Sequence, residues 1–186
     1  MARIVDLKQA AATACAVKIG GIEKIWIIDN SDISSVTFTE TAGKDAVVSA
    51  ITLGATKHAV EFEFTQDKTA FFNEAQANTG DPVDQTVSIF YDGLSTEKVD
   101  VANGLIGACA MSCFVKYKSG LIRFVGYDYD VATDTSSVCP TPLRAKISTA
   151  SGVGNNDAER LGIELIGQGK YLSHPTSLTE SALNAL

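Results

Sequence analysis

The feature that most constrains the fold is a close succession of short segments in which apolar residues alternate with polar ones or run together. Such segments are typical of β-strands. Because helices do not separate them, a parallel βαβ sheet is disfavoured, and an antiparallel sandwich or barrel is favoured. We expect roughly nine strands, at Ile22–Asp29, Ile33–Glu40, Val47–Leu53, Lys57–Gln66, Val83–Tyr91, Phe114–Tyr117, Leu121–Tyr127, Leu143–Ser148 and Arg160–Gln168.

One helix and one hairpin occupy the middle of the chain. Ser95 is suited to cap a helix, and the apolar positions behind it recur at helical spacing: Val99, Ala102, Ile106, Cys109 and Cys113. Lys118-Ser119-Gly120 then predicts the tight turn of a hairpin. A second, short helix is predicted over Lys68–Ala77, with Asp67 as its cap. The fold class is therefore mainly β: an antiparallel sandwich or barrel with one flanking α-helix.

The chain divides into three parts. Residues 1–20 are rich in alanine and form an arm or a short helix, residues 21–169 form the β domain, and residues 170–186 are a tail that docks on a neighbour or frays. Within the domain, Ile22–Asp29 and Ile33–Glu40 are expected to pair as a hairpin. Tyr127–Pro142 is polar and is expected to be a long loop or a subunit-contact segment.

The run Ile25, Trp26, Ile27 and Ile28 is apolar on both faces of its strand. Such a strand needs two covers, one from its own core and one from a second layer or another subunit. We therefore predict these four residues as subunit contacts. The polar loop at residues 41–45 is able to reach a neighbour as well, through Gly43, Lys44 and Asp45.

The charge of the chain excludes one broad class of function. The formal net charge is −7, so the protein is not expected to hold nucleic acid by neutralising phosphates. No stretch approaches the ~20 apolar residues of a membrane helix, and the first twenty residues lack the continuous apolar core of a secretory leader. We expect the four cysteines to be reduced.

No cluster of residues indicates catalysis, a cofactor or a metal. His58 and His174 are far in sequence from other metal-ligand types, and no phosphate loop or nucleophile elbow is present. Acidic residues gather at two places instead. Glu61 and Glu63 share the outward face of their strand, and Asp128 and Asp130 lie beside two tyrosines.

Three stretches together resemble the major tail tube proteins of tailed bacteriophages, which share a fold with the tube subunits of contractile injection and type VI secretion systems. The first is Gly21–Asp29 followed by Ile33–Phe38. The second is Phe62–Phe72 leading into Gln85–Ile89. The third is Lys116–Gly126 with the later segment Gly152–Gly167.

The resemblance implies a structural, non-enzymatic virion protein whose subunits form hexameric rings. The rings stack into a hollow tube through which DNA passes without specific binding. Implied partners are further copies of the chain, tape-measure, terminator and baseplate proteins, and in some tails a sheath. The implied place is the tail of the virion, assembled in the bacterial cytoplasm. Glu61, Glu63, Asp128 and Asp130 are candidates for an acidic wall of the channel, which would repel phosphates.

Three other functions stay open. A head–tail connector or terminator could be built on the same kind of sandwich. A ligand-binding β-sandwich would use exposed aromatic residues such as Tyr127 and Tyr129. An enzyme would lose its activity when Asp128 or Asp130 is changed. Paired carboxylates could catalyse hydrolysis, although nothing in the sequence singles out a particular pair.

Overall fold

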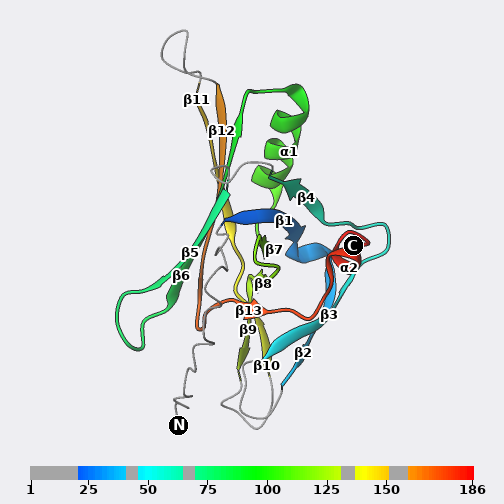
Figure 1. Cartoon of the computed structure of the whole chain (residues 1–186), viewed down its shortest axis with the longest axis vertical. Coiled ribbons are helices and arrows are strands. Elements are labelled where there is room, and N and C mark those ends of the chain that lie inside the picture. The colour runs from blue at the N-terminus through cyan, green and yellow to red at the C-terminus, as the bar shows by residue number, and fades with distance from the viewer. Residues whose placement is uncertain (1–20, 41–45, 65–69, 131–136, 151–158) are drawn as a thin grey trace, which may run out of the picture.

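The structure is a computed structural model that describes residues 21–40, 46–64, 70–130, 137–150 and 159–186 (Figure 1). Its centre is a five-stranded antiparallel sheet in the order β13-β8-β7-β1-β4. The bounds of these strands are β1 Ile22–Asp29, β4 Val60–Glu63, β7 Met111–Tyr117, β8 Ile122–Val125 and β13 His174–Pro175.

A second antiparallel sheet has four strands in the order β11-β12-β6-β5. Their bounds are β5 Ala70–Gln76, β6 Val83–Asp92, β11 Arg144–Ala150 and β12 Arg160–Gly169. The two sheets enclose the main core, in which Ile25 and Ile27 of β1 meet Val87 and Ile89 of β6. Alternation along each strand produces this core, because every second side chain of β6 and β12 points to the same face.

Two ribbons and two α-helices complete the described fold. β2 (Ile33–Thr39) pairs with β3 (Val47–Leu53), and β9 (Tyr127–Asp130) pairs with β10 (Ser137–Pro140). Helix α1 (Thr96–Gly107) contacts β11, and α2 (Glu180–Leu183) is a single turn near the C-terminus. The chain leaves β1 through the short 3-10 turn η1 (Asn30–Asp32). No helix in the described part of the chain has the length and apolar character needed to cross a membrane.

A second core lies on the other face of the five-stranded sheet. There Trp26 and Ile28 of β1 pack with Phe114 and Phe124, under the β2–β3 ribbon and the C-terminal segment. Figure 1 shows this segment, in orange and red, passing from β12 across to α2 beside β2 and β3. The five-stranded sheet is therefore covered on both faces by its own chain.

Several sequence predictions are confirmed. The fold is mainly β and antiparallel with a flanking helix, and most of the predicted strands form close to their expected limits. Ser95 caps α1, since its side chain accepts a hydrogen bond from the Lys98 amide at 3.3 Å. Gly120 has a φ of 86° in the turn between β7 and β8, a conformation that costs glycine little.

The predicted helix over Lys68–Ala77 is wrong. The structure describes Ala70–Gln76 as strand β5, paired with β6 along its whole length. Ala70 and Phe72 point to the core, whereas Phe71 points away from it. The spacing of Phe71, Phe72 and Ala75 fits one face of a helix. In β5 these residues divide between the two faces of the strand, and pairing with β6 decides for the strand.

The predicted hairpin between Ile22–Asp29 and Ile33–Glu40 is also wrong, although both strands form. β1 pairs with β4 and β7, and β2 pairs with β3. The turn η1 takes the chain out of the first sheet, and the Asn30 amide donates to the carbonyl of Ala110 at 2.9 Å.

The predicted buried face of α1 needs correction. Ala102 and Leu105 are buried, whereas Ile106 is 62% exposed. The helix ends at Gly107, so Cys109 lies beyond it and is exposed, and Cys113 lies in β7 and is buried. Helical spacing was thus extended too far, across a helix end and into a strand.

The two remaining corrections concern segments expected to lack structure. Tyr127–Pro142 contains the β9–β10 ribbon instead of a continuous loop, although residues 131–136 lie outside the described part. The tail docks on its own chain, where Leu183 is 1% exposed in the second core. The proposed arm at residues 1–20 is outside the described residues as well.

Candidate functional site

The candidate site for assembly is the four-stranded sheet, because both of its edges are long and open. β5 and β11 have 7 residues each, and neither pairs with a further strand in the described structure. The edges of the five-stranded sheet are β4, with 4 residues, and β13, with 2. Very short edge strands are a common protection against unwanted pairing, so the longer edges of the four-stranded sheet are better suited to bind another strand.

Most side chains on the outer face of this sheet are exposed, although Ser88 of β6 is buried there. Phe71 is 51% exposed and stacks on Phe90 with ring centroids 6.4 Å apart. Polar pairs surround this aromatic pair. Lys146 lies 3.2 Å from Glu164, and Gln168 donates to Asp84 at 2.7 Å. The face therefore combines an aromatic pair with one ion pair and one hydrogen bond between polar side chains.

Two of the acidic residues predicted for a channel wall, Glu61 and Glu63, lie on β4 and are exposed. Both point toward Lys24, whose Nζ lies 2.8 Å from Glu61 and 3.6 Å from Glu63. Hydrogen bonds to Glu61 and Glu180 raise the pKa of Lys24, so the lysine stays charged. The two glutamates thus belong to an ion-pair network instead of forming an uncompensated acidic patch.

Asp128 is not a surface residue, which contradicts its predicted place on a channel wall. Its side chain is buried under the C-terminal segment and accepts a hydrogen bond from the Lys170 amide at 2.5 Å. Burial raises the pKa of the Asp128 carboxyl, and the hydrogen bond from Lys170 opposes this shift. For Asp130, the structure places the backbone in β9, paired with Ser137.

The alternative function of a ligand-binding β-sandwich requires Tyr127 and Tyr129 to be exposed, but both rings pack against other residues of the chain. Tyr129 is buried, and its ring stacks on Phe38 with centroids 5.1 Å apart. Tyr127 stacks on Phe124 at 5.6 Å. Their contacts join the β9–β10 ribbon to the second core.

The predicted subunit contacts Ile25, Trp26, Ile27 and Ile28 are all buried within the chain, each at most 2% exposed. Ile25 and Ile27 lie in the main core, and Trp26 and Ile28 lie in the second core. The prediction that a neighbour covers them is therefore wrong. The cover comes from the β2–β3 ribbon and the tail, and Trp26 donates a hydrogen bond to Asn184 at 3.0 Å. Gly43, Lys44 and Asp45 lie outside the described residues.

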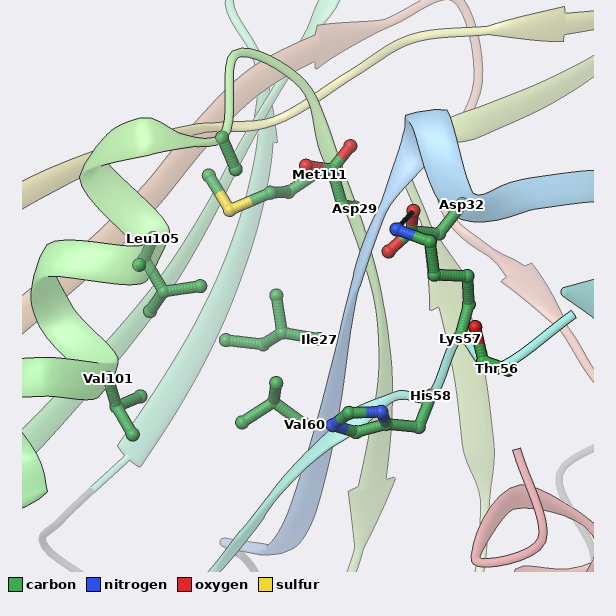
Figure 2. A pocket seen from close by; sticks show the side chains of 12 residues that line it. Ile27, Asp29, Asp32, Thr56, Lys57, His58, Val60, Val101, Leu105 and Met111 are labelled. Carbon is green, nitrogen blue, oxygen red and sulfur yellow. Dashed lines mark ion pairs between the residues drawn. The ribbon is translucent and has the colours of Figure 1, made fainter. Parts of the chain in front are cut away.

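A pocket of about 490 Å³ lies between α1 and the strands β1 and β4 (Figure 2). Its wall is apolar and its rim is polar. At the rim, Lys57 reaches Asp32 with an N–O distance of 2.7 Å, and this hydrogen bond raises the pKa of Lys57. Asp29 and His58 also line the pocket, so its rim is polar and only its wall is suited to an apolar group. The apolar wall comprises Ile27, Val60, Val101, Leu105 and Met111.

Sequence reasoning missed a polar cluster that fixes the tail to the sandwich. Arg123 on β8 lies 2.8 Å from Glu74 on β5, and donates to the Ser173 carbonyl at 2.6 Å. The Ser173 amide donates to Glu74 at 2.5 Å. A charged residue on the inward face of β5 was the only available signal, and it was hidden because this segment was interpreted as a helix.

In the described part of the chain, no group of three or more histidine, cysteine or acidic residues is placed to hold a metal ion. Comparisons with protein-family models, with curated proteins and with solved structures gave no match.

Proposed function

We propose that the chain is a structural subunit that assembles into stacked, hexameric rings and so builds the tail tube of a bacteriophage, a conduit for DNA. The sequence resemblance motivates this function, and one structural observation carries it. The four-stranded sheet has an even number of antiparallel strands and two open edges of equal length.

An even number of antiparallel strands makes the two edge strands run in opposite directions. β11 opposes β12, β12 opposes β6, and β6 opposes β5, so β5 and β11 are antiparallel to each other. Two copies related by a rotation can therefore join β5 to β11 and continue the antiparallel alternation. Such head-to-tail joints form a ring when the rotation closes.

The negative net charge of the chain is consistent with a channel through which DNA passes without binding. Each copy carries a formal charge of −7, so a ring of copies would repel phosphates along a channel instead of binding them. Glu61 and Glu63 are exposed and remain candidates for the channel surface, but their pairing with Lys24 compensates part of their negative charge. The four apolar residues of β1 no longer support the proposal, since the chain covers them itself.

Electron microscopy tests the proposal directly. The purified full chain, imaged in negative stain and sized by sedimentation velocity, should form rings and stacks of rings with a hollow centre. Single rings that never stack would favour the terminator alternative. A protein that stays monomeric or dimeric at high concentration would contradict the tube and would favour a binding module that uses the pocket beside α1.

A further inference from the structure

A narrow apolar groove runs along the open edge of the four-stranded sheet. It lies between α1 and β11 and has a volume of about 250 Å³. Small-molecule sites usually measure about 300–1,000 Å³, so this groove is better suited to a protein side chain. Ile106 of α1 lines this groove and is 62% exposed. The lining includes Val99, Ala102, Ile106, Ile147, Thr149 and Leu161.

The opposite edge of the same sheet carries a side chain that could fill this groove. Phe72 lies on the inner face of β5 and is only partly buried against the main core. Ile147 lies on the inner face of β11, again partly buried. The two residues therefore point to the same side of one sheet, from its two opposite edges.

Two alternative pairings between copies are less suitable. A symmetric pairing of β11 with β11 would bring two α1 helices to one joint, because α1 lies against β11 in each copy. A symmetric pairing of β5 with β5 would leave the groove open. Only the pairing of β5 with β11 covers the groove and uses both edges.

We propose that the groove between α1 and β11 binds strand β5 of a second copy of the chain, with Phe72 of that copy opposite Ile147. This inference deepens the proposed self-assembly and rests on it. In this antiparallel register Ala70 lies opposite Thr149 and Glu74 lies opposite Ala145, so residues of the inner faces match. Apolar burial in the groove and backbone hydrogen bonds along the edge together stabilise the joint.

A charge-rescue experiment tests this joint. Phe72→Glu and Ile147→Lys each place an unpaired charge in the groove, which is costly. We expect each single variant to need about tenfold or more protein to form rings. The double variant places Glu opposite Lys at every joint and should recover assembly. Within one molecule β6 and β12 separate the two positions, by about 14 Å at the usual strand spacing, so an ion pair cannot form inside the chain.

The matched control is Ile166→Lys, which adds a charge at an exposed position on the outer face of β12 and should leave assembly unchanged. Circular dichroism and thermal unfolding check that every variant is folded. If rings form equally well with both single variants, the joint is wrong and the tube proposal survives. If the natural chain never assembles, both proposals fail.

Should the charged variants not fold, a cysteine pair replaces them. Facing residues of antiparallel strands have Cβ atoms about 4.5–5.5 Å apart, so Ala70→Cys together with Thr149→Cys should give covalent oligomers on mild oxidation. Each single cysteine variant controls for the exposed Cys109 and Cys139. Assembled rings that yield no cross-link beyond these controls would overturn the proposed register.

Discussion

At the scale of single residues, two partly buried lysines organise the surface around β4 and α2. Lys24 on β1 and Lys116 on β7 both bind Glu180, at 2.9 and 2.5 Å, and Lys116 also lies 3.0 Å from Glu23. The two lysines are thus shared among the carboxylates of Glu23, Glu61, Glu63 and Glu180. Hydrogen bonds from Lys116 and Lys24 lower the pKa of Glu180.

This pKa shift predicts a pH dependence of stability with a definite sign. A carboxyl whose pKa is lower in the folded protein stabilises it above the unfolded pKa, and that stabilisation is lost as the pH falls through the folded pKa. Glu180→Gln should therefore lower the denaturant midpoint at pH 7, and the difference from the natural chain should shrink below pH 4.5, the unperturbed value. Urea unfolding at pH 7 and pH 3 measures this.

Glu63→Gln is the control, because the Glu63 side chain is 64% exposed and lies 3.6 Å from Lys24. Exposed pairs contribute little, so its midpoint should follow that of the natural chain at both pH values. A Glu180→Gln variant whose deficit stays constant across this range would show that the carboxylate charge is not responsible.

At the scale of elements, the C-terminal segment decides whether the five-stranded sheet is complete. It adds β13 to β8, and the Thr176 hydroxyl donates to the Val48 carbonyl at 2.9 Å. It then places Leu183 in the second core, against a sheet face that includes Trp26. The segment therefore takes the place that the sequence prediction had assigned to a neighbouring subunit.

Two leucines of this segment provide a matched test. Leu183→Ala removes a side chain that is 1% exposed and should destabilise the protein by about 2–4 kcal/mol. Leu172→Ala removes one that is 55% exposed and should cost about 0.5 kcal/mol or less. Chemical denaturation measures both. Equal midpoints for the two variants would mean that the segment does not close the second core.

At the scale of the whole molecule, the described residues cover the faces of the central sheet but leave the two edge strands of the four-stranded sheet without a neighbouring strand on one side. Both faces of the central sheet are covered, whereas no strand among the described residues pairs with the outer edges of β5 and β11. If copies of the chain associate as proposed, the four-stranded sheet offers the surface for it, whereas β1 does not.

The net charge of each copy predicts how assembly responds to salt. Copies that each carry −7 repel one another, and the screening length falls from about 10 Å at 0.1 M salt to about 3 Å at 1 M. Ring formation should therefore require less protein at high salt, as sedimentation velocity at the two salt concentrations would show. Ile147→Lys should need about tenfold or more protein than the natural chain at both salt concentrations. Weaker assembly at high salt would mean that ion pairs dominate the joint.

The amino-acid sequence by itself determined most of the strands and which side of them is buried, although it did not reveal β5, β9 or β10. In the predicted strand Arg160–Gln168, Leu161, Ile163 and Leu165 alternate with residues of the other face, and all three are buried. The cap of α1 at Ser95 was also readable, because capping depends on residues within one turn. Local patterns of this kind were sufficient for the fold class.

Only the tertiary structure decided which strands pair and what covers the second face of β1. The sequence cannot distinguish a neighbour from the chain's own tail as the cover of Trp26, since both bury the same apolar surface. Gly126 shows the same limit on a smaller scale. It has a φ of 108° between β8 and β9 and leaves no room for a side chain beside Ser112, yet the strand pattern runs through it. Periodicity records that a side chain is buried, whereas the partner that buries it is set by contacts between residues far apart in the chain.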